Sequence, residues 1–294
     1  MLGSVPNCES VVNFKVMRYA CPGRIGSSAY GGLCVRLFTA AILAMLSGPA
    51  FFERLNTITA QAAAGANWEP IAGGVAYARA VAGTGRGGIP VHLLKVDLER
   101  ATLRALLLPR FSSALRVSDF ATRFPDALAV FNGSFFDDSK EGREIPKGIV
   151  VSEGRVHQGL LRSKPWAVFF IDRQGAHITS PDAYRPSAST RFALQGFPRL
   201  VEQGTVLQFK PQVSQRTALG ILGPRTILVL ITRDGSELSL QELAQALRAF
   251  GCRSAINLDG GSSAQLWLKR PSARPLIEYG YNHVPVAIGV FRRP

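Results

Sequence analysis

Short runs of β-favouring residues recur along residues 67–294, and Gly, Pro or Asp residues stand between them. Turn residues at such short intervals leave little room for long helices and favour strands joined by tight connections. No internal repeat, charge block or long linker interrupts this stretch, so we expect one domain over residues 67–294. We predict strands at residues 74–79, 91–97, 102–108, 128–131, 148–152, 166–172, 192–195, 226–232, 254–258, 265–268 and 286–291.

Two helices are expected beside these strands. Along residues 240–250, apolar residues recur at i, i+3 and i+4 spacing on one face. Ser239 and Glu242 form a capping box at its start, and Gly251 stands where a left-handed residue often ends a helix. The second helix covers residues 117–124, before Pro125. The expected class is therefore α+β, a large mixed, mostly antiparallel β-sheet system with a few packed helices.

Residues 1–62 have the pattern of an N-terminal leader. Arg36 precedes an apolar core at residues 37–46, and small residues follow at 47–50 and 60–62. This order is typical of a signal peptide. We expect an exported protein, periplasmic or secreted, with an uncleaved membrane anchor or a buried helix as alternatives. Three of the four cysteines lie in the leader, so cleavage leaves Cys252 alone and excludes an internal disulfide.

The charge balance indicates an anionic partner. Lys and Arg total 34 against 20 Asp and Glu, a formal net charge of +14. The leader contributes +3 of this, so residues 63–294 carry +11. Such a surface attracts phosphorylated glycans, acidic polymers or nucleic acid. Nucleic acid is disfavoured, because aromatic residues are not interleaved with basic ones and because we expect export.

Neither a nucleotide cofactor nor a metal has support in the sequence. Gly83, Gly85 and Gly88 fit the G-x-G-x-x-G pattern, but another β-like run follows them where a dinucleotide site needs a helix. The four histidines lie far apart, with no H-E-x-x-H or Cys/His pairing. We therefore expect no cofactor and no metal.

Two segments, residues 131–137 and 255–263, share one design. In each, an apolar strand ends in an Asn, with a Gly and an Asp close behind. Loops at strand ends commonly carry functional groups. Gly260 and Gly261 allow backbone N–H groups to converge on an anion, and Ser262 and Ser263 add hydroxyl donors. The alternative interpretation is a pair of Asx/Gly turns with no ligand.

Six sequence blocks in a fixed order carry a resemblance to a known family. They are Asn132-Gly-x-Phe-Phe-Asp, Ile145-Pro146-Lys147-Gly148 with Gly154 after it, residues 195–201, residues 216–220, residues 257–263 and residues 287–290. Together they resemble the phosphodiester glycosidase family over residues 91–291. Asn282 and Val286 depart from it, since they stand where an Arg and an Asn often flank the last strand, and Ser134 and Ala264 replace a common Gly and Thr.

The resemblance implies a hydrolase that cleaves sugar-1-phosphodiester linkages in envelope or extracellular glycans. For this chemistry we predict Asp259 as base or nucleophile, and Asn132 and Asn257 as groups that orient sugar hydroxyls or water. The expected phosphate-binding set is Gly260, Gly261, Ser262, Ser263, Arg216 and Lys147. The second carboxylate is left open among Asp137, Glu141 and Glu144.

The rival prediction is a non-catalytic protein that binds anionic glycans in the cell envelope. In either case the expected partner is a phosphorylated glycan or a sugar phosphodiester, with no nucleic acid. A membrane would be contacted only through an uncleaved leader.

Overall fold

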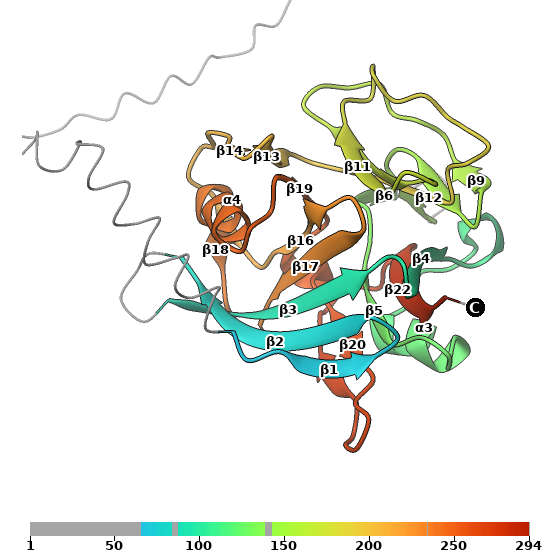
Figure 1. The fold of residues 1–294 in the computed structure, drawn as a ribbon. Helices are drawn as coiled ribbons and strands as arrows, with labels where there is room; N and C mark the ends of the chain where they lie inside the picture. The colour runs from blue at the N-terminus through green and yellow to red at the C-terminus, as the bar shows by residue number, and fades with distance from the viewer. Residues whose placement is uncertain (1–65, 84–87, 139–142, 234, 294) are drawn as a thin grey trace, which may run out of the picture. The chain divides into compact units, whose positions relative to one another are not determined.

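The computed structural model describes residues 66–83, 88–138, 143–233 and 235–293 (Figure 1). The predicted leader, residues 1–62, lies outside the described residues, and so does Glu141. Within the described residues, no helix has the length and apolar character needed to cross a membrane.

Antiparallel sheets make up most of this fold. The largest has eight strands in the order β1-β2-β3-β17-β16-β19-β13-β14. Its members are β1 (Glu69–Ala72), β2 (Val75–Ala82), β3 (Ile89–Asp97), β17 (Thr226–Thr232), β16 (Thr217–Gly223), β19 (Ser254–Asn257), β13 (Arg199–Glu202) and β14 (Thr205–Val206). Every pairing in it is antiparallel.

Two five-stranded sheets complete the frame. One is ordered β21-β20-β5-β22-β4 and the other β11-β10-β12-β8-β9. Their strands are β21 (Leu276–Glu278), β20 (Leu266–Leu268), β5 (Ala129–Asn132), β22 (Ala287–Arg292), β4 (Ala101–Leu106), β11 (Ala176–Thr179), β10 (Ala167–Ile171), β12 (Phe192–Gly196), β8 (Val150–Ser152) and β9 (Arg155–Gln158). Short ladders pair β15 (Val213–Ser214) with β18 (Leu238–Ser239) and β6 (Phe136–Asp138) with β7 (Glu144–Pro146). Two 3₁₀ turns, η1 (Pro109–Phe111) and η2 (Gly261–Ser263), lie in connections.

Strand alternation places two separate cores on the two faces of the eight-stranded sheet. On β3, Leu94 and Val96 pack into a core that β5, β20 and β22 share. Val91 and Leu93 point the other way, toward the helix α4 (Leu240–Ala249). Because side chains alternate with a period of two, a strand covered on both sides reads as a nearly continuous apolar run.

The two helices pack on the outer faces of the stacked sheets. Helix α4 begins with the predicted capping box, in which Ser239 Oγ accepts from the Glu242 amide at 3.1 Å and a Glu242 carboxylate oxygen accepts from the Ser239 amide at 3.0 Å. Helix α3 (Val117–Arg123) packs on the outer face of β5 and β22 through Phe120. The layer order is therefore α4, eight-stranded sheet, β5–β22 sheet and α3, as Figure 1 shows.

The structure confirms the α+β class, and all ladders between described strands are antiparallel. Each predicted segment contains a strand, and both predicted helices are present. The sequence analysis does not predict a strand at β16, although residues 216–220 form one of the six blocks of the family resemblance. Its sequence, TALGILG, contains two glycines, which weaken strand propensity, and it extends because β17 and β19 pair with it on both sides.

Candidate active site

Three strand ends from two sheets meet at the candidate site. Strand β5 ends at Asn132, β16 begins at Thr217, and Asp259 follows the end of β19. The Asn132 side chain joins all three, because its Nδ2 donates to the Asp259 carbonyl at 2.7 Å while its Oδ1 accepts from Thr217 Oγ1 at 2.7 Å. The Gln265 amide donates to the same Oδ1 at 3.2 Å. The structure thus brings the two segments found in the sequence into direct contact.

The Asn132 side chain is also completely buried. The residue is 0% exposed, and its oxygen already accepts two hydrogen bonds. Buried amides with satisfied partners hold structure in place and offer little to a ligand. Asn132 is therefore placed to position the Asp259 backbone, and not to contact a sugar hydroxyl as the sequence suggested.

The glycines around Asp259 are required by close backbone approach. The Asp259 amide donates to the Gly133 carbonyl at 3.3 Å, and a Cβ on Gly133 would lie 2.8 Å from the Val286 carbonyl oxygen. A Cβ on Gly260 would collide with the Gln215 carbonyl, and Gly261 has φ +56°. Only glycine fits such positions without strain.

The two glycine amides do not form the predicted anion nest. The Gly260 amide donates to Asp259 Oδ1 at 3.0 Å, and the Gly261 amide donates to the Gln215 carbonyl at 2.8 Å. Both N–H groups are therefore used inside the protein. Of the two serines, Ser263 is buried and hydrogen-bonds the Asp259 side chain, whereas Ser262 is exposed.

Burial makes the Asp259 carboxyl unusually basic. It raises the pKa from 3.8 to about 6, against the opposing effect of hydrogen bonds from Ser263 and from the Gly260 amide. Desolvation disfavours the ionised form, while hydrogen bonds favour it. A carboxyl with such a pKa is ionised at neutral pH and accepts a proton more readily than an ordinary aspartate.

Two buried polar atoms near Asp259 have no hydrogen-bond partner among the described residues. Asn257 donates through Nδ2 to the Phe197 carbonyl at 2.7 Å, but its Oδ1 is unpaired. The hydroxyl of Ser134, next to Gly133, is also unpaired and only 1% exposed. Such atoms are rare in folded proteins and commonly mark functional positions.

Arg216 is occupied by main-chain bonds. Its Nε donates to the Leu238 carbonyl at 2.9 Å and its Nη2 to the Gln212 carbonyl at 2.6 Å, and the residue is 7% exposed. Burial lowers its pKa, while the charge of Glu237 acts in the opposite direction. Its neighbour Thr217 faces Asn132, so strand alternation turns Arg216 to the other face of β16. The predicted phosphate contact at Arg216 is not what this geometry supports.

Lys147 and Asp137, predicted separately as a phosphate cation and a second carboxylate, form an ion pair at 2.7 Å. The Lys147 side chain is 37% exposed and that of Asp137 is 67% exposed. The Lys147 amide donates to the Phe135 carbonyl at 2.7 Å, which ties this pair to the Asn132 segment. Glu144 lies on β7, where it pairs with Asp138 across the β6–β7 ladder.

Three aromatic residues adjoin the two segments of the site and were given no role from the sequence, although Phe135 and Phe197 lie in family blocks. Phe135, Trp166 and Phe197 form a cluster with ring centroids 5.6 to 6.4 Å apart. Phe135 is two residues beyond Gly133, which bonds Asp259, and the Phe197 carbonyl accepts from Asn257. The cluster therefore adjoins both segments of the site. We call Phe135, Trp166 and Phe197 the aromatic cluster.

Among the described residues, no three His, Cys, Asp or Glu side chains gather closely enough to hold a metal ion. The polar groups near Asp259 are amides and hydroxyls, which suit sugar hydroxyls and water as hydrogen-bond partners.

Solved structures share this fold. The catalytic domain of zebrafish N-acetylglucosamine-1-phosphodiester alpha-N-acetylglucosaminidase, auto-inhibited by its pro-peptide, superposes with a TM-score of 0.59 at 18% identity, covering 77% of this chain and 88% of that one. A hypothetical protein from Synechocystis gives a TM-score of 0.52 at 17% identity, covering 75% of this chain and 62% of that one. The comparison with curated proteins found no match.

Fold and site together define a β-rich α+β domain whose polar groups gather at the ends of strands from two sheets. The sequence model of one family, phosphodiester glycosidase, matches residues 125–291, more than half of the 294 residues. The match includes both segments that meet at Asp259. The chain belongs to the phosphodiester glycosidase family.

Proposed function

We propose that this protein hydrolyses sugar-1-phosphodiesters at the glycosidic carbon. Water adds to C1, the bond between C1 and the phosphate oxygen breaks, and that oxygen keeps the electron pair. The products are a free sugar and a phosphomonoester on the acceptor. The observation that carries the proposal is the partly buried Asp259, whose pKa is about 6, at the junction of the two family segments.

Asp259 acts in this proposal as the base that takes a proton from the attacking water. Its raised pKa supports the role, because a general base works best with a pKa near the working pH. Its charge also stabilises positive charge at C1 as the bond breaks. The unpaired Asn257 Oδ1 and Ser134 Oγ are both buried, so they are proposed to bind an enclosed water and not the sugar itself.

The phosphate needs less help than an ordinary leaving group. A phosphodiester oxygen leaves as a weak base, so a strong general acid is not required, and donors around the phosphate carry the larger demand. Lys147 is the proposed cation, because its side chain is partly exposed while Arg216 is used by carbonyls. The exposed Ser262 hydroxyl is the second proposed donor.

The aromatic cluster is proposed to hold the sugar ring. Ligand sites combine apolar and aromatic walls with a few polar groups that fix orientation. Phe197 is 36% exposed, so part of the cluster is open to a ligand. A sugar lying on it would have Asp259 and Asn257 close by.

We propose envelope or extracellular glycans as the substrates, and export as the route by which the enzyme reaches them. The support is the leader pattern of residues 1–62 together with the net charge of +11 on the rest of the chain. N-terminal sequencing of protein from each cell fraction tests the export. A chain found in the cytosol that retains Met1 would contradict it.

The decisive assay incubates the purified full-length protein with a panel of sugar-1-phosphodiesters and measures reducing sugar and phosphomonoester together. Equal amounts of both are expected. If Asp259 is the base, the released sugar has inverted configuration at C1. A sugar ester trapped on Asp259 would show a nucleophile instead, and phosphomonoester formed without free sugar would refute cleavage at the glycosidic carbon.

The second candidate is a glycan-binding protein without turnover. The occupied Arg216 and the pairing of Lys147 with Asp137 favour it over turnover, because a leaving phosphate needs strong cationic stabilisation whereas weak binding can use neutral hydrogen-bond donors. Calorimetry with the same panel distinguishes the two, because a binder retains intact phosphodiester after long incubation.

A further inference from the structure

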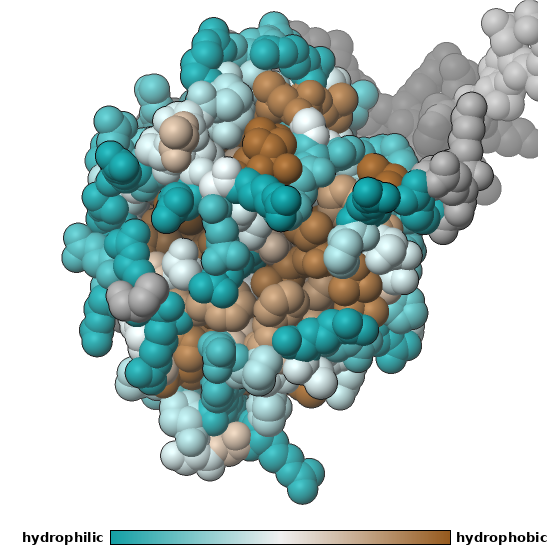
Figure 2. Space-filling view, turned by 90° about the vertical axis from the view of Figure 1, so that its right-hand side faces the viewer, coloured by the Kyte–Doolittle hydropathy of each residue, from teal (hydrophilic) through white to brown (hydrophobic). Residues whose placement is uncertain are grey.

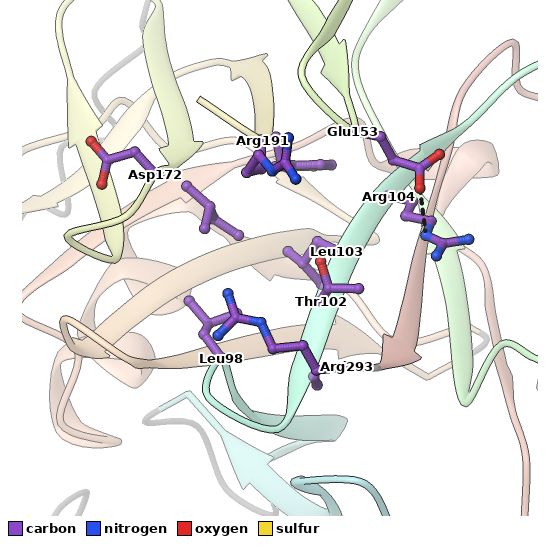
Figure 3. A pocket seen from close by; sticks show the side chains of 11 residues that line it. Leu98, Thr102, Leu103, Arg104, Glu153, Asp172, Arg191 and Arg293 are labelled. Atoms are coloured by element: carbon purple, nitrogen blue, oxygen red, sulfur yellow. Dashed lines mark ion pairs between the residues drawn. The ribbon is translucent and has the colours of Figure 1, made fainter. Parts of the chain in front are cut away.

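A concave region lies away from Asp259, at the edge where the two five-stranded sheets meet. It is a cavity of about 360 Å³ between the start of β4, the end of β10 and the start of β12. Its apolar lining includes Leu98 and Leu103, labelled in Figure 3, and Phe192. Figure 2 shows this side of the molecule, where hydrophobic surface lies between hydrophilic side chains.

Two arginines at this cavity have free guanidinium groups. Arg191 and Arg293 enter from different strand ends, as Figure 3 shows. Neither side chain makes a hydrogen bond or ion pair with any residue that the structure describes. A third arginine, Arg104, lies 3.3 Å from Glu153 and covers the Phe291 ring at 4.6 Å.

The acidic residue opposite them is already engaged. Asp172 Oδ1 accepts from the Gln174 amide at 2.8 Å and lies 3.0 Å from His177 Nε2. Its carboxylate is therefore used by hydrogen bonds to nearby residues of the same β10–β11 hairpin. The net effect is a cavity whose unpaired charges are positive.

Two more cavities share lining residues with the first and are also lined by arginines. One of about 210 Å³ shares Arg191 and Arg293 and adds Arg173. The other, of about 640 Å³, shares Arg104 and Arg293 and adds Lys269 and Arg292, together with the acidic Asp126 and with Arg270, which is paired with Glu69. We call this row the arginine trough, defined by Arg104, Arg173, Arg191, Lys269, Arg292 and Arg293.

We propose that the arginine trough binds a polymer that carries repeated phosphate groups. Guanidinium groups bind phosphate oxygens in a two-pronged geometry that lysine cannot supply. A single small anion fills one cavity, whereas three adjoining cationic cavities match an extended chain. The two aromatic rings of the trough, Phe192 and Phe291, are 1% and 5% exposed, so no base could stack on them as nucleic acid requires.

The trough is distinct from the candidate active site. On β22, Ala287 pairs with Asn132 at the active-site end, and Arg292 pairs with Ala101 at the trough end. The five steps between them span about 17 Å along the strand. Binding in the trough therefore does not depend on the proposed hydrolysis, and it can be tested even if no substrate is turned over.

The test measures binding of fluorescently labelled linear polyphosphate to the full-length protein by anisotropy at several salt concentrations. The double variant Arg191→Gln/Arg293→Gln is expected to bind at least about tenfold more weakly. The slope of log affinity against log salt should fall by about two, one for each lost contact. The control Lys210→Gln/Arg253→Gln removes the same charge from exposed residues outside the trough and should change affinity less than about twofold.

A second variant places charge in the trough without removing an arginine. Ala188 is exposed and lines the smallest cavity, so Ala188→Glu should weaken binding while Ala188→Gln should not. Circular dichroism and thermal unfolding verify that each variant is folded. The proposal is overturned if the trough and control variants lose affinity equally, if orthophosphate binds as tightly as the polymer, or if single-stranded DNA of equal charge binds more tightly.

Discussion

At the scale of single residues, the chemistry depends on how far Asp259 is removed from water. Burial raises its pKa to about 6, and hydrogen bonds from Ser263 and Gly260 limit the rise. Asn132 holds the backbone of Asp259 and is itself inaccessible. One residue therefore carries the proposed reaction while the other fixes its position.

Replacing Asp259 with Asn tests the proposed base. The substitution keeps the size of the side chain and removes its negative charge. We expect kcat to fall by roughly two or more orders of magnitude with KM nearly unchanged, since a group that acts in the transition state affects the chemical step. Steady-state kinetics on whichever sugar-1-phosphodiester the panel identifies provides the measurement. Near-normal turnover by the folded variant would exclude Asp259 as the catalytic carboxylate.

The same substitution has a stability effect that depends on pH. The folded-state pKa of about 6 exceeds the ordinary 3.8, so this group contributes stability below pH 4 that is lost as pH rises through 6. The Asp259→Asn variant has no carboxyl to ionise, so it does not lose this stability as pH rises. Relative to the parent, the variant should gain up to about 3 kcal/mol between pH 4 and pH 8. Urea unfolding of both proteins at the two pH values measures it, and an equal difference at both would contradict the shifted pKa.

At the scale of elements, apolar strands and helix caps could be predicted from the sequence, because each depends on residues that are close together in the chain. The capping box of α4 needs only Ser239 and Glu242, three residues apart. Strand β16 was harder to predict, since its two glycines lower the strand propensity of the segment. Gly220 is needed there because a Cβ would meet the Cys252 sulfur, a contact that only the packing of α4 and β19 on β16 defines. The strand ends at Asn132 and Asp259 could be found, but their mutual bond could not.

The aromatic cluster joins three elements and is expected to determine sugar affinity. Trp166→Ala should raise KM several-fold while kcat changes less, because stacking acts on bound substrate and transition state alike. Trp68, which lies 4.7 Å from the Lys95 ammonium, gives the matched control Trp68→Ala. Kinetics of both variants on one substrate make the comparison. An equal effect from the two substitutions would mean general destabilisation and no role in binding.

At the scale of the whole molecule, function depends on contacts between sheets that are distant in sequence. The aromatic cluster combines residues 135, 166 and 197, and the trough combines residues 104, 191 and 293. No periodicity or spacing marks such sets, since only the folded sheets bring them together. The family blocks located Asp259, but they could not show that Arg216 is occupied by the carbonyls of Leu238 and Gln212.

The Asn132–Thr217 bond joins the eight-stranded sheet to the β5–β22 sheet, so it should couple their stabilities. Asn132→Ala leaves three buried groups without partners and should cost about 2–4 kcal/mol of unfolding free energy. Thr217→Val removes only the hydroxyl and should cost about 1–2 kcal/mol. The double variant should lose less than the sum by about 1 kcal/mol, because the shared bond can be lost only once. Urea unfolding gives all four values, with the exposed Asn67→Ala as a control expected within about 0.5 kcal/mol of the parent. Strict additivity would show that the two sheets are not coupled through this bond.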